Sequence, residues 1–260
     1  MSFVAADGSR LRLHAQSVPL GLWTGVYSDQ STLCFCLDSL DAGDAALDIG
    51  ANVGHFSVAF ARRVGRQGRV VSVEANPVVF RCLCDNLRLN KAECVQAVQA
   101  ALWREEGLRL SFRVPRGASD QGALAPTERS GRAAAEFEVT TRSGDHVLVD
   151  LCAEGAPVAL IKIDVEGAEL RVLEGMRRTV ARAACIVFEY DGDNCSAMGI
   201  DAAEVLALLR ASGFTLFEFD AAQRTLLAMD DGRDGGDRVA LRDPTAFCAR
   251  TRYRIIDVRG

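Results

Sequence analysis

A glycine-rich turn follows the first apolar segment of the chain, in Asp48-Ile-Gly50-Ala-Asn52-Val-Gly54. Gly50 and Gly54 permit a tight turn and the close approach of a ligand to the backbone. A helix is expected to begin directly after Gly54, and the free N–H groups at its start suit a carboxylate or a phosphate. The pattern is typical both of an ordinary strand-to-helix turn and of a ligand-binding loop, and the turn alone does not decide between them.

An acid closes the next apolar segment, VVSVE, which ends at Glu74. It lies about 20 residues beyond the glycine turn, the spacing at which a carboxylate in a strand–helix–strand unit can accept hydrogen bonds from ribose hydroxyls. A solvated carboxylate at a strand end is the simpler interpretation, and the pairing with the glycine turn disfavours it. The turn and the acid together indicate a nucleoside-containing cofactor.

Charge separates the candidate cofactors. The turn reads G-A-N-V-G instead of the G-x-G-x-x-G of dinucleotide sites, and Asp48 would repel a pyrophosphate placed there. S-adenosylmethionine carries an ammonium, a carboxylate and a sulfonium, so Asp48 can attract its cationic end while the helix start receives its carboxylate. The charges therefore favour S-adenosylmethionine over NAD.

Further acids follow a third apolar segment, in Ile-Lys162-Ile-Asp164-Val-Glu166-Gly-Ala-Glu169. In a doubly wound sheet this segment lies beside the one that ends in the glycine turn, so we expect Asp164 near the transferred methyl group. Glu166 and Glu169 are typical first-turn acids that complement a helix dipole. A magnesium site built from the three carboxylates is the alternative. Lys162 is expected to pair with a neighbouring acid.

Two more residues at the same rim are candidate bases. Glu189 ends the segment ACIVFE and is expected either to touch the methyl acceptor or simply to end a strand. His55 opens the helix after the glycine turn, and its titration range suits a general base, although a solvated first-turn histidine is the simpler interpretation. We take Asp164 as the first candidate for the catalytic base, followed by Glu189 and His55.

The elements that must position these residues alternate between apolar strands and amphipathic helices. Strands are predicted at 45–49, 69–75, 94–102, 158–164 and 184–190, and helices at 29–42, 55–65, 77–90, 167–181 and 201–212. This alternation predicts an α/β fold with a doubly wound, mostly parallel sheet. FTLFEF and RTLLAM predict a terminal antiparallel hairpin, residues 230–237 a loop, and residues 253–259 a last strand.

The chain organisation follows from these elements. We expect one catalytic domain over residues 44–228, a cap segment over 1–43, and an extension over 229–260 that packs on the same domain. Residues 114–134 are rich in Gly, Ala, Pro and Ser, which predicts a mobile loop that covers the acceptor. Strands at 106–113 and 135–141 are expected to flank that loop.

Composition excludes several classes of protein. The 260 residues are 49% hydrophobic and 25% charged, which is typical of a globular chain. A net charge of -5 argues against a broad basic surface for duplex nucleic acid. No apolar run reaches the roughly 18 residues of a membrane span, and the first residues lack the apolar core of a signal peptide. The nine cysteines favour a reducing, cytoplasmic compartment, and the lack of a C-x-x-C pair disfavours a zinc site.

Five segments resemble, in order and spacing, the FkbM-type S-adenosylmethionine-dependent methyltransferases: LDIGANVGHFS, VVSVEANPVVFRCLCDNLRLN, AALWREEG, IKIDVEGAELRVLEGM and IVFEY. The resemblance covers about residues 27–190 and implies a class I methyltransferase (Rossmann-like) fold. It implies cofactor contacts from Asp48, Gly50, Asn52, Gly54, Glu74, Asn76, Ala100, Ala101 and Asp164. The chain departs from the family after AAL, where Trp103-Arg104 stand in place of the usual Gly-Asp.

The resemblance implies O-methylation of a small molecule, a sugar or a natural-product intermediate, with S-adenosylhomocysteine as the product. The expected chemistry is in-line displacement at the sulfonium methyl, to which the protein contributes mainly the positioning of the nucleophile. Two alternatives stay open. A non-catalytic S-adenosylmethionine-binding scaffold would keep Glu74 and the glycine turn, and an NAD-dependent oxidoreductase would bind NADH.

Overall fold

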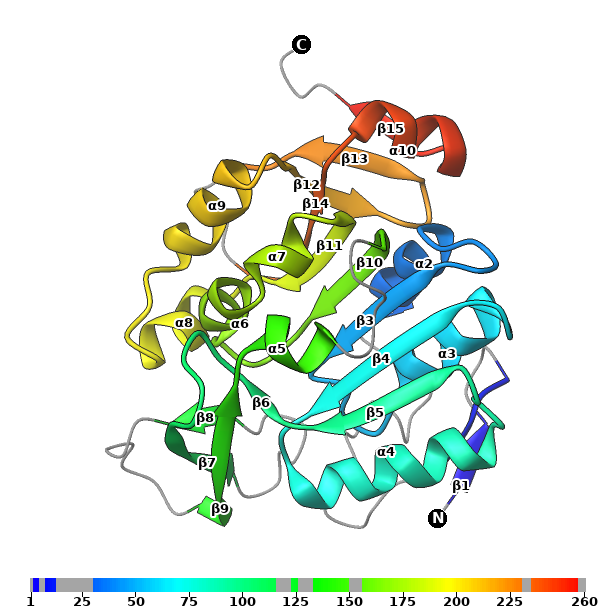
Figure 1. Cartoon of the computed structure of the whole chain (residues 1–260). Coiled ribbons are helices and arrows are strands. Elements are labelled where there is room, and N and C mark those ends of the chain that lie inside the picture. Colours follow the sequence, from blue (N-terminus) through cyan, green and yellow to red (C-terminus); the bar gives the residue numbers. More distant parts are fainter. Residues whose placement is uncertain are drawn as a thin grey trace.

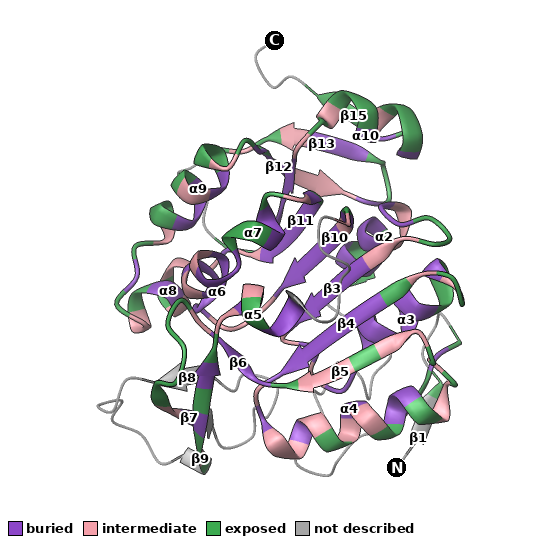
Figure 2. Cartoon of the chain, in the orientation of Figure 1, coloured by how far each residue is buried: buried purple, intermediate pink, exposed green. Residues whose placement is uncertain are grey.

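A large mixed sheet forms the centre of the computed structural model, which describes residues 2–4, 8–12, 30–115, 123–125, 133–149, 156–230 and 235–256 (Figure 1). Within these residues the sheet has nine strands in the order β15-β13-β12-β14-β11-β10-β3-β4-β5. Its central strands are the most deeply buried, as Figure 2 shows. The predicted doubly wound, mostly parallel α/β architecture is confirmed.

Five predicted strands form the parallel half of this sheet: β3 (Ala45–Ile49), β4 (Arg69–Glu74), β5 (Val95–Gln99), β10 (Val158–Ile163) and β11 (Ala183–Glu189). The prediction of one continuous strand over 94–102 is wrong. β5 ends at Gln99, and β6 (Ala101–Leu102) leaves the sheet to pair with another strand. The change of partner is visible in the backbone, since Ala100 still donates to Glu74 whereas Trp103 donates to Arg142.

The C-terminal part of the sheet differs most from the prediction. β12 (Thr215–Asp220) and β13 (Thr225–Ala228) form the predicted antiparallel hairpin. However, β14 (Asp237–Leu241) lies between β11 and β12 and is antiparallel to both, whereas no strand was predicted there. β15 (Arg254–Ile256) pairs in parallel with β13 at the sheet edge. The segment after residue 228 therefore contributes strands to the same sheet.

A short apolar run explains why β14 was not predicted. Val239, Ala240 and Leu241 follow a stretch of glycine and charged residues, and three residues in isolation carry no useful periodicity. All three are buried once β11 and β12 supply hydrogen bonds on both sides. The position between β11 and β12 exists only in the tertiary structure.

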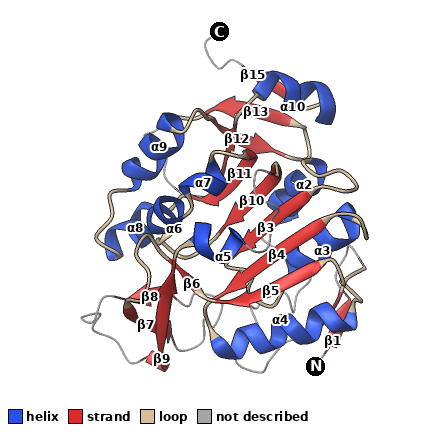
Figure 3. Ribbon diagram, in the orientation of Figure 1, coloured by secondary structure: helices blue, strands red, loops and turns tan. Residues whose placement is uncertain are grey.

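Helices cover both faces of the sheet, as Figure 3 shows. One buried cluster joins the sheet to α2 (Gln30–Asp38), α3 (His55–Val64) and α10 (Pro244–Thr251). The other joins it to α5 (Gly144–Val149), α6 (Glu169–Gly175), α7 (Arg177–Val180), α8 (Gly192–Ala197) and α9 (Ala202–Ala211). None of the helices in the described ranges is long and apolar enough to cross a membrane.

Local sequence explains where the principal helices begin. The side chain of Asn76 caps α4 (Pro77–Leu89) by accepting hydrogen bonds from the N–H groups of Val78 and Val79, and Pro77 follows it in the first turn. Asp201 caps α9 in the same way through Ala203. The predicted helix over 167–181 is interrupted instead, because α6 ends at Gly175 and α7 starts at Arg177.

A small second sheet stands beside the large one. β7 (Arg109–Pro115) pairs antiparallel with β9 (Ala133–Arg142) and with β8 (Ala123–Ala125), and β6 joins its edge. The two longer strands match those predicted on either side of residues 114–134. Most of that predicted mobile loop lies outside the described residues. Residues 1, 5–7 and 13–29 of the predicted cap segment also lie outside them, whereas β1 (Ser2–Val4), β2 (Arg10–Arg12) and α2 are described.

Candidate active site

The glycine turn and Glu74 are joined by hydrogen bonds at the carboxyl edge of the parallel strands. After β3 ends, the N–H groups of Gly50 and Ala51 both donate to the carbonyl of Val73, at 3.0 and 2.9 Å. Glu74 Oε2 accepts a hydrogen bond from the N–H of Asn52 at 2.9 Å, and its Oε1 accepts one from the N–H of Asn76 at 2.7 Å. The carboxylate therefore holds both the loop after β3 and the start of α4.

Glycine is required in the turn by the packing of the chain itself. Gly50 has φ +77°, and a Cβ there would lie 1.8 Å from the backbone oxygen of Asp164. Gly54 has φ +89°, and its Cβ would meet Leu83 Cδ1 on α4 at 2.5 Å. The two glycines were expected to permit a tight turn and the approach of a ligand, and the positive φ values agree with the turn. The structure adds another physical reason for glycine, because both missing side chains would point into neighbouring protein.

Burial perturbs the proton affinity of Glu74. The side chain is buried, and desolvation raises its pKa to about 7, while the backbone hydrogen bonds from Asn76 and Asn52 oppose this rise. Near neutral pH the carboxyl group therefore exists in both protonation states. Each state keeps lone pairs that can accept a hydrogen bond from a ribose hydroxyl.

Asp48 lies beneath the turn and has no exposed surface. Its Oδ2 accepts a hydrogen bond from Ser57 Oγ on α3 at 2.5 Å, and its Oδ1 is 4.0 Å from Lys162 Nζ on β10. Burial is the main reason that its pKa is raised, and the Lys162 ammonium acts against this. The cation beside Asp48 is thus a lysine of the protein, where the sequence analysis expected the cationic end of the cofactor.

Lys162 donates a hydrogen bond to Asp164, which agrees with its predicted pairing with a neighbouring acid. Its Nζ is 3.0 Å from Asp164 Oδ2, and the lysine side chain is 6% exposed whereas that of Asp164 is 37% exposed. Asp164 therefore presents part of its carboxylate at the surface of the site. Its backbone N–H donates to the carbonyl of Ile49, which places it directly beside the end of β3.

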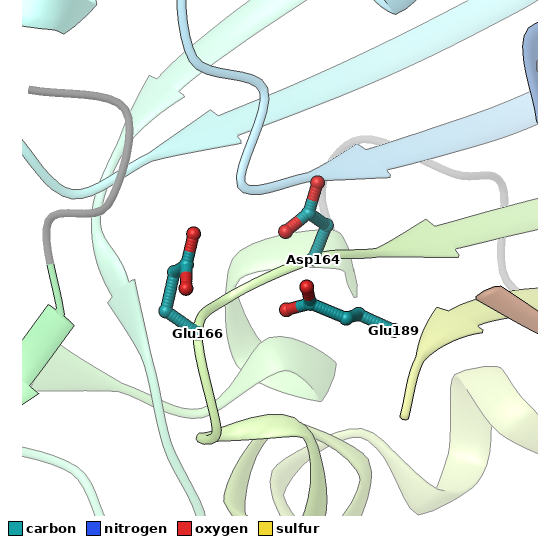
Figure 4. A group of neighbouring side chains, drawn as sticks. All are labelled: Asp164, Glu166 and Glu189. Carbon is teal, nitrogen blue, oxygen red and sulfur yellow. The ribbon is translucent and has the colours of Figure 1, made fainter. Parts of the chain in front are cut away.

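Three carboxylates face one another at this rim: Asp164, Glu166 and Glu189. One oxygen of each lies within 4.8 Å of the others, and Figure 4 shows the three side chains around a common space. Glu166 also accepts a hydrogen bond from Asn194 Nδ2 at 3.0 Å. Glu169, which belonged to the magnesium alternative, is buried and accepts from the N–H groups of Val165 and Gly167. The cluster that forms therefore contains Glu189 in place of Glu169.

The environment of Glu189 favours its protonated form. Burial, followed by the charges of Asp164 and Glu166, raises its pKa to about 9. Its Oε2 is buried and has no hydrogen-bond partner among the described residues. At neutral pH the group is therefore a hydrogen-bond donor, which makes it a poor general base in this state.

His55 is the first residue of α3 and is 7% exposed. Its ring lies edge-on to that of Phe56, with 5.9 Å between the ring centroids. The interpretation as a solvated first-turn histidine is therefore wrong, because the side chain is buried.

The remaining expected cofactor contacts line the same edge of the sheet. Asn76 is buried, and its side-chain oxygen is already used to cap α4. Ala100 and Ala101 are buried where the chain passes from β5 to β6, and Ala100 donates to the backbone oxygen of Glu74. At these two residues the chain leaves the large sheet, where β5 pairs with β4, and enters the small sheet, where β6 pairs with β9.

Sequence reasoning missed two buried serines and one asparagine in this region. Ser72 and Ser57 bond to each other at 2.8 Å beside Asp48. Asn86 on α4 donates to the carbonyl of Val53 at 2.8 Å. It also forms two hydrogen bonds with the backbone of Arg12 on β2, because its Oδ1 accepts from the N–H and its Nδ2 donates to the carbonyl. The sequence signal for such residues is a polar side chain on an otherwise apolar strand or helix face. This signal is weak, because polar residues are common at the ends of strands and helices.

Comparison with known proteins identifies the family. The model of the methyltransferase FkbM domain matches residues 48–216. The chain is 30% identical over 168 residues to the methyltransferase sdnD of Sordaria araneosa, which covers 55% of this chain and 64% of that protein. It is 29% identical over 222 residues to the 31-O-demethyl-FK506 methyltransferase FkbM of Streptomyces tacrolimicus, which covers 75% and 81%.

Among solved structures, the O-methyltransferase TomG of Streptomyces achromogenes is similar with a TM-score of 0.49 and 15% identity, over 83% of this chain and 80% of that one. The matched domain contains the glycine turn, Glu74, Asp164 and Glu189. The chain therefore belongs to the FkbM family of S-adenosylmethionine-dependent methyltransferases.

Proposed function

We propose that this protein transfers the methyl group of S-adenosylmethionine to a hydroxyl group of a small-molecule acceptor, such as a sugar or a natural-product intermediate. The observation that carries the proposal is the placement of Glu74 and Asp164 on either side of the glycine turn. The three features follow β4, β10 and β3, which are neighbouring parallel strands, so all of them lie at one edge of the sheet. Ligands of open α/β sheets bind at this edge.

The cofactor is held from both sides in this arrangement. Glu74 accepts hydrogen bonds from the ribose hydroxyls, and the start of α3 receives the carboxylate of the amino-acid end. The excess of acids at the rim suits a ligand that carries an ammonium and a sulfonium. The curated relative from Streptomyces tacrolimicus is, by its name, a methyltransferase of an O-demethyl compound, which supports a hydroxyl acceptor.

The reaction is an in-line displacement. The acceptor oxygen forms a bond to the methyl carbon, and the carbon–sulfur bond breaks with its electron pair left on sulfur as S-adenosylhomocysteine forms. The hydroxyl proton passes to Asp164, whose carboxylate is partly exposed at the rim. Glu189 is protonated at neutral pH, and His55 is buried, so Asp164 is the better placed base.

The test is turnover with an isotope-labelled methyl donor and a panel of hydroxylated acceptors, including a metabolite extract. Asp164→Asn should lower the single-turnover rate by roughly 10²-fold or more, because it removes a positioned acid–base group, while cofactor affinity changes far less. Cofactor binding without transfer to any acceptor would support a non-catalytic scaffold instead. A lower melting temperature of Asp164→Asn with wild-type chemistry would reduce Asp164 to a structural role.

A further inference from the structure

A row of polar side chains crosses three neighbouring strands beneath the candidate active site. Ser72 Oγ on β4 donates to Ser57 Oγ at 2.8 Å, and Ser57 Oγ donates to Asp48 Oδ2 on β3. Lys162 Nζ on β10 lies 4.0 Å from Asp48 Oδ1 and donates to Asp164 Oδ2 at 3.0 Å. The row begins in the core and reaches the surface of the site at Asp164 alone.

Strand register explains why these side chains meet. Asp48 pairs with Ser72 on one side and with Lys162 on the other, so the three residues share one face of the sheet. Asp164 follows Lys162 by two positions and therefore begins on the same face. The row is set by the backbone pairing of three adjacent parallel strands.

Lys162 is the basic member of this row, and it remains a cation despite its burial. Desolvation alone would lower its pKa, but the charges of Asp164 and Asp48 outweigh that effect and raise it. The ammonium also lies 4.6 Å from the centroid of the Phe56 ring, which stabilises a cation further. A buried cation with these partners has little freedom to move.

We propose that Lys162 is a positioning residue for methyl transfer, which orients the Asp164 carboxylate beside the acceptor. The inference rests on the proposed role of Asp164 as the base. It adds that Lys162 sets the orientation of that carboxylate. Lys162 occupies one carboxylate oxygen, Oδ2, and leaves the other oxygen to receive the acceptor proton.

Asp164 lies among other acids, so the Lys162 cation is needed to offset repulsion between carboxylates. Glu166 and Glu189 also approach Asp164, and one oxygen of each of the three carboxylates lies within 4.8 Å of the others. Without a cation, repulsion from the Glu166 carboxylate would turn the Asp164 carboxylate away, and the acceptor would lose a positioned base. Lys162 offsets that repulsion from a position that the acceptor does not occupy, because the lysine side chain is 6% exposed.

A double-mutant cycle tests the inference with Lys162→Met, Asp164→Asn and the two combined. Lys162→Met should lower the single-turnover rate by roughly tenfold or more, with a far smaller effect on the dissociation constant of S-adenosylhomocysteine. In the Asp164→Asn background the same change should have almost no further effect on the rate, because the lysine acts through that carboxylate. Rate effects that multiply in the combined variant would overturn the inference.

A second pair of variants separates positioning from folding. Removing Lys162 leaves the carboxylate of Asp48 buried without its cation, which can destabilise the protein. Asp48→Asn and Asp48→Asn/Lys162→Met contain no such unpaired charge at position 48, so their rates are compared with each other at temperatures below both melting points. We expect the second to be slower by roughly tenfold or more. Equal rates would show that Lys162 is only structural.

The outcomes for the two residues are distinguishable. If Asp164→Asn reacts at the wild-type rate, the proposed base is wrong, and the inference about Lys162 falls with it. If Asp164→Asn is slow while Lys162→Met reacts at the wild-type rate, the proposed function stands and Lys162 has no positioning role.

Discussion

Glu74 Oε2 accepts a hydrogen bond from the backbone N–H of Asn52 at 2.9 Å, so the acid that ends β4 fixes the loop that follows β3. Asn52 has φ 50°, in the left-handed region that residues other than glycine rarely adopt. The hydrogen bond helps to hold that conformation. One carboxylate thus shapes the loop, and we propose that it also accepts hydrogen bonds from the ribose.

Glu74→Ala should remove both the hydrogen bonds to the backbone and the expected hydrogen bonds to the ribose. We expect the affinity for S-adenosylhomocysteine to fall by roughly tenfold or more, since hydrogen bonds to a charged group contribute about 1.5–3 kcal/mol each. The N–H groups of Asn52 and Asn76 also lose their acceptor, so the melting temperature should fall. Calorimetric titration measures the first effect and thermal unfolding the second. Glu74→Gln, which keeps one acceptor oxygen, should lie between alanine and the wild type; unchanged affinity in both variants would remove Glu74 from the site.

Gly50→Ala should destabilise the protein far more than a comparable change elsewhere. Its Cβ would lie 1.8 Å from the backbone oxygen of Asp164, so β3 and β10 would have to separate. Gly43→Ala is the matched control, because Gly43 has φ +91° with nothing within 4 Å of the added Cβ. The control should show only the cost of left-handed alanine, about 1–2 kcal/mol. Chemical denaturation of both variants measures the difference, and equal losses would contradict the proposed clash.

The stability of the ligand-free protein should decrease as pH rises towards 9. Burial and neighbouring acids raise the pKa of Glu189 from 4.5 to about 9, so between these values the folded state keeps a proton that the unfolded state has lost. Glu74 and Glu169, with pKa values raised to about 7, act in the same direction at lower pH. Above pH 7 the remaining decrease should come mainly from Glu189.

Glu189→Gln should therefore flatten the dependence of the melting temperature on pH between 7 and 9, because glutamine has no proton to lose. Glu204→Gln, at an exposed position on α9, is the control and should leave the wild-type slope in place. Melting curves across this range provide the measurement. A wild-type slope in Glu189→Gln would mean that Glu189 is already ionised in the folded protein.

Methyl transfer should survive removal of divalent cations. A protonated Glu189 can donate to a neighbouring carboxylate, which lowers the negative charge of the trio it forms with Asp164 and Glu166. The measurement is turnover after dialysis against EDTA and again after addition of Mg²⁺. Loss of activity with EDTA that Mg²⁺ restores would assign the three carboxylates to a cation site instead.

Much of the fold could be predicted because the local signals agree with the tertiary structure. The strands that carry Asp48, Glu74 and Asp164 are apolar runs between helices with clear periodicity, and Pro77 and Asp201 mark helix starts. The predictions failed where a segment depends on distant partners. β14 becomes a strand only between β11 and β12, and β6 leaves the sheet only because β9 is present to receive it.

The sequence by itself determined which residues stand at the strand ends, because strand ends follow from apolar runs and the turns that close them. It thereby predicted the glycine turn and the acids around it, while the resemblance of five segments predicted the family. Only the tertiary structure decided what each acid faces. Asp48 faces Ser57 and Lys162, and Glu169 faces backbone N–H groups, while Glu189 joins Asp164 and Glu166. The physical reason is that spacing along the chain fixes on which strand a side chain lies, whereas register between strands fixes which charges become neighbours and how deeply they are buried.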